Sequence, residues 1–281
     1  MHHHTPVFGI MQGRLLQKYQ TRYQAHPVGY WKEEFPIAAE LGLASIEFIL
    51  DYNDAGINPL MSDQGIAEIK EVSRQTGVVV NTVCADYFME APLHHPDERV
   101  RRNSSEVLEV LLNNGAELGL KDIVLPCVDQ SSLNSYGAQD RLVTTLIPLL
   151  SLAEKTGINL ALETDLAPVP FTELLNRLDS KRITVNYDTG NSASLGYDPL
   201  EEFRLYGNRI SDIHIKDRKL GGGSVFLGTG DARFGDFLTA LSTIDYKMPF
   251  IFQVYRDDDG VEVFKQQMSF FKKMYNEFFK S

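Results

Sequence analysis

Residues 154–163, which read EKTGINLALE, join a charged helical segment to an apolar, strand-like run through Gly157. The same pattern recurs around Gly42, Gly77 and Gly119, as AELGLASIEFIL (39–50), RQTGVVVNTV (74–83) and AELGLKDIVL (116–125). A glycine just after a helix supplies the left-handed residue with which many helices end, and a strand can then begin. Helices and strands that alternate at this period indicate βα units and a parallel sheet.

Working outward from these repeats, we expect eight strands with a helix after each of them. The strands are predicted near residues 6–12, 44–50, 78–84, 122–128, 159–164, 183–188, 210–216 and 250–256. The helices are predicted near residues 32–41, 64–76, 98–118, 138–156, 170–179, 199–206, 234–243 and 260–279. Eight such units in 281 residues predict a single-domain α/β fold, the (β/α)8 TIM barrel. An open doubly wound sheet is the alternative, and the lack of a G-x-G-x-x-G motif after the first strand argues against its dinucleotide-binding form.

Composition narrows the functional classes. The apolar fraction of 43% and the charged fraction of 23% are typical of soluble globular proteins. A net charge of −11 argues against nucleic acid as a partner, and no apolar run is long enough for a membrane span. Cys84 and Cys127 lie in apolar strand-like segments, so we interpret them as reduced core residues of a cytoplasmic protein. Residues 1–4 read as a tag remnant or a disordered start.

Four consecutive predicted strands end in a polar residue, and each of these residues has bulky apolar neighbours. They are Glu163 in LALETD, Asp188 in ITVNYDTGN, His214 in HIKDR and Gln253 in IFQVY. Because side chains alternate along a strand, apolar neighbours that face the helices leave the four polar side chains pointing into the barrel. The active sites of such barrels lie at the carboxyl ends of the strands. We therefore expect the four residues to converge there.

Carboxylates and an imidazole that are buried together are costly unless they are paired or bind a metal. Oxygen ligands with one imidazole and no thiolate suit one divalent ion, Mn, Mg, Co or Zn. The competing interpretation for each residue alone is a hydrogen-bonded core residue. A glycine-rich segment, Gly221–Asp231, follows the seventh predicted strand and is either a phosphate-binding loop or a plain turn. We expect Asp231 to cap the helix that follows.

The chain resembles the xylose isomerase-like TIM barrels, a family that includes sugar and sugar-phosphate isomerases and epimerases and also endonuclease IV. The resemblance extends over residues 5–281 and rests on the motifs GIMQGRL (9–15), SIEF (45–48), CADYF (84–88), LALETD (160–165), NYDTGNS (186–192), HIKDR (214–218) and LGTGD (227–231). In the family the last four strands supply Glu, Asp, His and Glu to one metal. Glu163, Asp188 and His214 match that set, whereas Gln253 stands where the family has its second Glu.

The resemblance implies a metal-dependent isomerase or epimerase that acts on a sugar or sugar phosphate through an enediolate. Glu163 would be the base, and Gln253 would occupy the second catalytic position, where an amide cannot act as an acid or base. The residues expected to bind substrate are Glu47, Asp86, Asn191, Lys216, Arg218 and Arg256. Family members often form homo-oligomers, which extends to this chain by analogy only.

Two alternatives remain open from the sequence. One is a metal-dependent dehydratase of the inosose or dehydroshikimate type, which needs one base and a polarised carbonyl. The other is a non-catalytic sugar-binding barrel that lost its activity with the second Glu. An endonuclease IV-like DNA repair enzyme is disfavoured, because the net charge is −11 and the chain has few histidines beside His214 near the predicted mouth.

Overall fold

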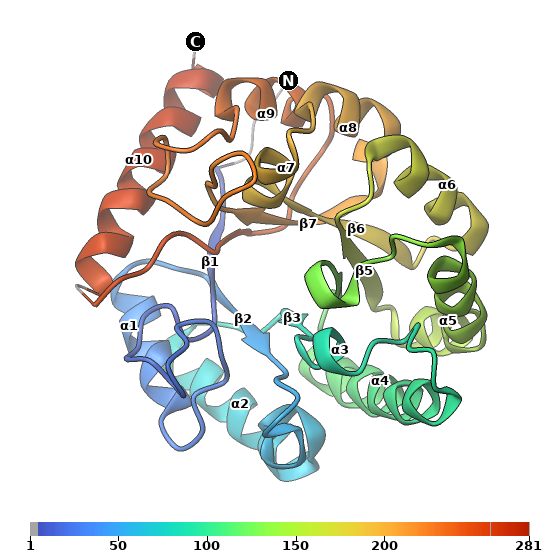
Figure 1. Cartoon of the computed structure of the whole chain (residues 1–281). Helices are drawn as coiled ribbons and strands as arrows, with labels where there is room; N and C mark the ends of the chain where they lie inside the picture. Colours follow the sequence, from blue (N-terminus) through green and yellow to red (C-terminus); the bar gives the residue numbers. More distant parts are fainter. Residues whose placement is uncertain (1–4, 259, 281) are drawn as a thin grey trace.

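A computed structural model describes residues 5–258 and 260–280, and these form a closed barrel of eight parallel strands with helices around it (Figure 1). The strands follow one another in chain order around the barrel, and the last pairs with the first. They are β1 (Phe8–Met11), β2 (Ser45–Ile49), β3 (Thr82–Cys84), β4 (Asp122–Cys127), β5 (Asn159–Thr164), β6 (Ile183–Asp188), β7 (Ile210–Ile215) and β8 (Phe250–Phe252). The prediction of a (β/α)8 TIM barrel is confirmed. The interpretation of residues 1–4 concerns residues outside those described.

Helices surround the barrel (Figure 1). They are α1 (Glu34–Glu40), α2 (Asp63–Thr76), α3 (Tyr87–Glu90), α4 (Glu98–Leu118), α5 (Tyr136–Thr156), α6 (Pro168–Leu178), α7 (Thr189–Leu195), α8 (Pro199–Tyr206), α9 (Phe234–Leu241) and α10 (Val261–Lys280). The short helices α3 and α7 were not predicted, and α7 begins directly after β6. None of the helices in the described part of the chain has the length and apolar character needed to cross a membrane.

The repeated helix–glycine–strand pattern has the predicted conformation. Gly157 ends α5 with a φ of 75°, and its N–H donates to the carbonyl of Ala153. Gly77 and Gly119 end α2 and α4 in the same left-handed conformation. Two predicted strands are shorter than expected, because β3 and β8 have three residues each. Val79, which was predicted to lie in the third strand, pairs with β2 only through an isolated bridge to Ser45. Val254, which was predicted to lie in the eighth strand, accepts a hydrogen bond at its carbonyl from the side chain of Arg14.

The barrel wall separates two cores. Outward-facing strand residues such as Leu160, Leu162 and Ile213 pack with the helices in the main hydrophobic cluster. Within the described part of the chain, a small apolar cluster lies inside the barrel, formed by Met11, Ile49, Cys84, Val124, Ala161 and Ile251. The rest of the interior is therefore open to polar side chains. Cys84 and Cys127 are both unpaired and buried, as expected for core residues.

Candidate metal and substrate site

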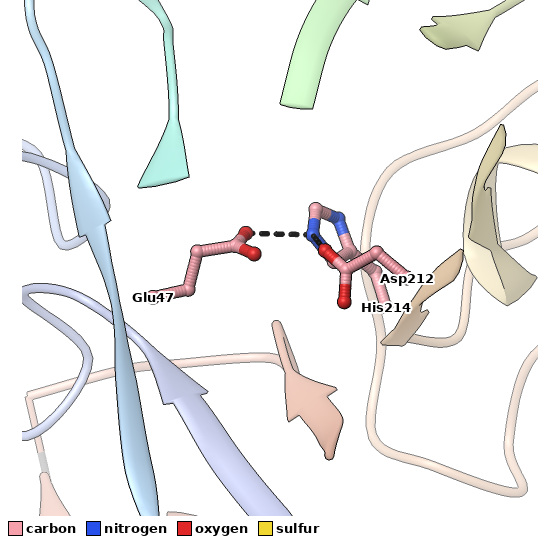
Figure 2. Close-up of side chains that lie close together, drawn as sticks. All are labelled: Glu47, Asp212 and His214. Atoms are coloured by element: carbon pink, nitrogen blue, oxygen red, sulfur yellow. Dashed lines mark hydrogen bonds and ion pairs between the residues drawn. The ribbon is translucent and has the colours of Figure 1, made fainter. Parts of the chain in front are cut away.

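His214 lies at the centre of the polar interior, on β7, and is completely buried. Its Nε2 is 2.7 Å from Oε1 of Glu47, which projects from β2 across the barrel (Figure 2). Oδ2 of Asp212, two residues earlier on β7, is 3.6 Å from the same nitrogen. A ring whose Nε2–H donates to Glu47 presents the lone pair of Nδ1 on its other side.

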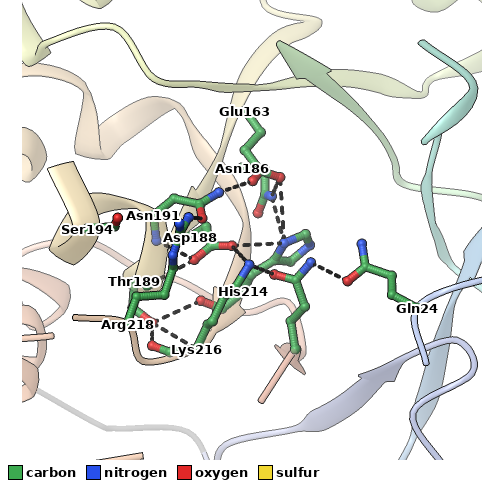
Figure 3. Close-up of polar contacts among 12 residues, drawn as sticks. Gln24, Glu163, Asn186, Asp188, Thr189, Asn191, Ser194, His214, Lys216 and Arg218 are labelled. Carbon is green, nitrogen blue, oxygen red and sulfur yellow. Dashed lines mark hydrogen bonds and ion pairs between the residues drawn. The ribbon is translucent and has the colours of Figure 1, made fainter. Parts of the chain in front are cut away.

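The other nitrogen of His214, Nδ1, is 3.0 Å from Nδ2 of Asn186 and also faces the two carboxylates that the strand pattern predicted. Nδ1 is 3.7 Å from Oε2 of Glu163 and 4.0 Å from Oδ2 of Asp188 (Figure 3). Each residue offers one ligand atom, and the three atoms lie within 4.8 Å of one another. Because metal–ligand bonds are about 2.0–2.2 Å long, two ligands of one ion lie roughly 3–4 Å apart. The spacing of these three residues fits a single divalent ion.

Neighbouring N–H groups hold both carboxylates in place. Oδ1 of Asp188 caps α7 by accepting from the backbone N–H groups of Gly190 and Asn191, both at 2.8 Å, and this leaves Oδ2 directed toward His214. Glu163 accepts from Nδ2 of Asn186 at 2.9 Å and from Nδ2 of Asn191 at 2.5 Å. The stretch NYDTGN therefore supplies one candidate ligand, Asp188, and also supplies the N–H groups that hold both Asp188 and Glu163 in place.

Gln253 follows β8 directly, and its backbone N–H continues the sheet by donating to the carbonyl of Ile215 at 3.0 Å. Its Oε1 accepts from Nζ of Lys216 at 3.1 Å, and its Nε2 donates to Oε1 of Gln24 at 2.7 Å. Lys216 Nζ is also 3.5 Å from Oδ2 of Asp188. Gln253 thus lies beside the three potential ligands and is linked to them through Lys216. We call Glu163, Asp188 and Gln253 the upper group.

The electrostatics of the upper group favour an added positive charge. Burial and then the charge of Asp188 raise the pKa of Glu163 to about 7. Burial opposes protonation of His214, but the neighbouring carboxylates, Glu47 first, outweigh it and raise the pKa of His214 well above its usual value. The raised pKa values mean that this cluster stabilises an added positive charge. A cation between Glu163, Asp188 and Nδ1 of His214 would supply that charge.

A second set of carboxylates lies deeper in the barrel, and we call Glu47, Asp122 and Asp212 the lower group. All three are at most 1% exposed. Among the described residues, Oε2 of Glu47 and the Oδ2 atoms of Asp122 and Asp212 have no hydrogen-bond partner. Burial raises the pKa values of Asp122 and Asp212 to about 7, with a further increase from a neighbouring carboxylate in each case. Asp122 and Asp212 were missed by the sequence interpretation, although their inward parity could have marked them.

A cavity of about 300 Å³ opens above the upper group, at the carboxyl ends of the strands. Six of the residues predicted for the site line it: Asp86, Glu163, Asn191, Lys216, Arg218 and Gln253. Gln24 also lines it and was not predicted; its Oε1 accepts from Arg14 as well as from Gln253. We call this space the mouth cavity.

Two residues predicted to bind substrate lie elsewhere. Glu47 is enclosed below His214 and is not part of the lining of the mouth cavity. Arg256 also lies outside that lining, where it donates to the carbonyls of Arg14 and Leu16 and covers the ring of Tyr23. Through these contacts Arg256 holds the loop that follows β1. Pairing across the barrel and loop contacts of this kind leave no periodic signal in the sequence.

The glycine-rich segment after β7 is organised by Asp217. The carboxylate of Asp217 accepts from the backbone N–H groups of Gly228, Gly230 and Ala232, at 2.8–3.0 Å. The prediction that Asp231 caps the next helix is wrong, because α9 begins at Phe234 and Asp231 instead accepts from the N–H of Leu220. Backbone donors of the kind that bind phosphate are here used by the chain's own carboxylate.

Comparisons with known proteins place these features in context. A family model described as xylose isomerase-like TIM barrel matches residues 35–274. L-ribulose-5-phosphate 3-epimerase UlaE of Escherichia coli is 24% identical over 259 residues, which covers 86% of this chain and 89% of that protein. The 2-epi-5-epi-valiolone 7-phosphate 2-epimerase of an Actinoplanes species is 27% identical over 234 residues, which covers 81% of this chain and 84% of the relative.

Solved structures give the same architecture. The crystal structure of D-psicose 3-epimerase with D-tagatose from Clostridium cellulolyticum H10 superposes with a TM-score of 0.70. The match covers 88% of this chain and 93% of that one, at 18% sequence identity. At this identity the likeness supports the fold alone.

Proposed function

Because this chain belongs to the xylose isomerase-like TIM barrel family, we propose that it is a sugar isomerase or epimerase that moves a proton at the carbon beside a carbonyl group. The observation that carries the proposal is the convergence of Glu163, Asp188 and Nδ1 of His214 at the floor of the mouth cavity. The relatives named above are epimerases of sugar-like phosphates, which supports this class of reaction. They lend no support to the dehydratase alternative.

The site fits one divalent ion, Mn, Mg, Co or Zn. Glu163, Asp188 and His214 would hold it. The amide oxygen of Gln253, which accepts from Nζ of Lys216, is the fourth candidate ligand. When bound, such an ion stabilises negative charge that develops on substrate oxygens. Oδ2 of Asp188, the buried carboxylate of Glu163 and Nδ1 of His214 are the donor types that such ions take.

Glu163 is the base in this proposal. Its carboxylate takes the proton from the carbon next to the carbonyl, and the C–H electron pair forms the carbon–carbon double bond of an enediolate as the carbonyl oxygen takes up charge. Asn186 and Asn191 fix the carboxylate for this step through one hydrogen bond each. Return of the proton to the neighbouring carbon, with transfer of the hydroxyl proton from one oxygen to the other, gives isomerisation. Return of a proton to the opposite face of the same carbon gives epimerisation.

Gln253 orients groups in the site and carries no transferable proton at neutral pH. Its amide is fixed at both ends, by Lys216 Nζ at 3.1 Å and by Oε1 of Gln24 at 2.7 Å. Between the two carbons, isomerisation requires only Glu163 as proton carrier, and the hydroxyl proton moves between the two neighbouring oxygens of the enediolate. Epimerisation requires a second proton carrier on the other face, and an amide at position 253 cannot be that carrier.

The test is solvent exchange. Purified protein supplied with Mn²⁺ is incubated with a panel of ketoses and ketose phosphates in deuterated water, and the products are followed by NMR. We expect deuterium at the carbon beside the carbonyl, and its position distinguishes isomerisation from epimerisation. Glu163→Gln should slow the exchange by about 10²–10⁴-fold, because it removes the base and keeps the shape.

The matched control is Glu109→Gln, which makes the same change at an exposed position on α4. It should leave the exchange rate unchanged. Exchange that proceeds equally in wild type and Glu163→Gln would overturn the assignment of the base, and exchange absent from every substrate in wild type would overturn the proposed function.

A further inference from the structure

The mouth cavity is more acidic than basic. Five carboxylates line it, Asp51, Asp86, Glu90, Asp129 and Glu163, against three cationic side chains, Arg22, Lys216 and Arg218. Asp188 lies directly beside Lys216 and adds a further negative charge to the floor. Even with one divalent ion bound, the formal charge of cavity and floor together stays negative.

Each cationic side chain in the lining already has partners. Arg22 donates to Oδ1 of Asp51 at 2.7 Å, and Lys216 donates to Asp188 and Gln253. Arg218 donates to the carbonyl of Gly222 and to Oδ1 of Asn191, both at 2.9 Å. Moving Arg218 to a new anion would also release Asn191, which holds Glu163.

Two further groups that could bind a phosphate also have partners within the chain. Asp217 takes the backbone N–H groups of Gly228, Gly230 and Ala232 in the loop after β7. Arg14 lies outside the lining and donates to the carbonyl of Val254 and to Gln24. A phosphate ester carries about −1.5 to −2 charges at neutral pH and needs several such donors.

We infer that the substrate of this site is an uncharged, unphosphorylated sugar. The inference rests on the proposed function and names its substrate class. Carboxylates accept hydrogen bonds and cannot donate them when ionised, so Asp86, Glu90 and Asp129 suit the hydroxyl groups of a polyol and repel a phosphate. A volume of about 300 Å³ is at the small end of ligand cavities, which fits a single sugar unit. On this inference the chain differs in substrate from the two sequence relatives named above, whose names specify phosphates.

The first experiment compares binding within matched pairs. Isothermal titration of Mn²⁺-supplied protein uses D-fructose against D-fructose 6-phosphate and D-ribulose against D-ribulose 5-phosphate, at low ionic strength. We expect at least one free sugar to bind about tenfold or more tightly than its phosphate ester. Equal or tighter binding of the esters, or binding of none of the four compounds, overturns the inference.

The deuterium exchange assay is run on the same samples, so the two proposals fail separately. A phosphate preference with exchange rejects the substrate class and keeps the proposed function. A free-sugar preference without exchange rejects the proton transfer and keeps the substrate class, because binding is read without turnover.

Charge variants test the cause of the preference. Glu90→Gln combined with Asp129→Asn removes two negative charges from the exposed rim of the cavity. At low salt, this double variant should reduce the ratio of free-sugar affinity to phosphate-ester affinity by about three- to tenfold. Asn is well tolerated at position 129, where φ is +50°. The control removes two exposed charges on α4 instead, by Glu106→Gln with Glu109→Gln. If the rim variant and the control had the same ratio of free-sugar to phosphate-ester affinity, this result would contradict the electrostatic account.

Discussion

The upper and lower groups are both sets of buried side chains within the same barrel, and His214 touches both. They differ in how their oxygens are satisfied. In the upper group, Asn186, Asn191 and the start of α7 donate to Glu163 and Asp188, and the mouth cavity opens above them. In the lower group, each carboxylate keeps one oxygen without a partner among the described residues, and all three are sealed from solvent.

This difference shows that burial of acidic residues alone does not identify a binding site. A site that exchanges ligands needs access and carboxylates held in position, and only the upper group has both. A neutral imidazole can ligate a metal with one nitrogen only if the other keeps its proton. Because Nε2 of His214 faces Glu47, we propose Nδ1 as the ligating atom, with the cation in the upper group and the support of His214 in the lower group.

The largest effect that separates the two groups is expected at Glu47. Glu47→Leu removes the acceptor for Nε2 of His214, and metal affinity should fall by about 10- to 100-fold, as for other partners of ligating histidines. Glu47→Gln keeps an acceptor oxygen for Nε2 of His214, so its metal affinity should fall much less than that of Glu47→Leu. Metal affinity is measured by competition with a fluorescent chelator.

A structural readout accompanies the affinity measurement. Long-range ¹H–¹⁵N NMR of the metal-loaded protein reports which nitrogen of His214 carries the proton, and we expect Nε2 in wild type and in Glu47→Gln. A proton on Nδ1 of the loaded wild type, or an unchanged affinity in folded Glu47→Leu, would contradict the assigned role of Glu47.

A smaller effect, on stability, is expected at Asp122 in the lower group. Its pKa is raised from 3.8 to about 7 in the folded state, so the folded protein binds more protons than the unfolded chain between these pH values. The free energy of unfolding should therefore fall as pH rises from about 4 to 7, and the cost is fully present above pH 7. Asp122→Asn removes this cost but leaves a buried amide N–H without a partner, so the net gain at pH 8 should be about 1–2 kcal/mol.

The check on Asp122 is a pair of urea titrations at pH 4.5 and pH 8. Asp122→Asn should be more stable than wild type at pH 8, and the difference should shrink toward zero or reverse at pH 4.5. The carboxamide keeps the acceptor for Asn159 and Ser211, so the fold is preserved. If the stability difference between Asp122→Asn and wild type were the same at pH 4.5 and pH 8, the charge of Asp122 would carry no electrostatic cost.

Local patterns in the sequence were enough to predict the barrel and to predict that Glu163, Asp188 and His214 lie close together. Glycine-terminated helices set the repeat, and the alternation of side chains along β5, β6 and β7 placed Glu163, Asp188 and His214 inside. The contact between Glu47 and His214 joins residues 167 positions apart on opposite sides of the barrel, so no local pattern could reveal it. The roles of Asp217 and Arg256 likewise depend on loop conformations that follow from the folded chain.

The most direct test of the central claim is the number of Mn²⁺ ions that the protein binds, measured by equilibrium dialysis. We predict one ion per chain in wild type and in Asp212→Asn, and none at the same free Mn²⁺ concentration in Asp188→Asn, whose side chain keeps an oxygen to cap α7. No bound ion in wild type, or an ion lost from Asp212→Asn and retained in Asp188→Asn, would contradict the assignment of the metal to the upper group.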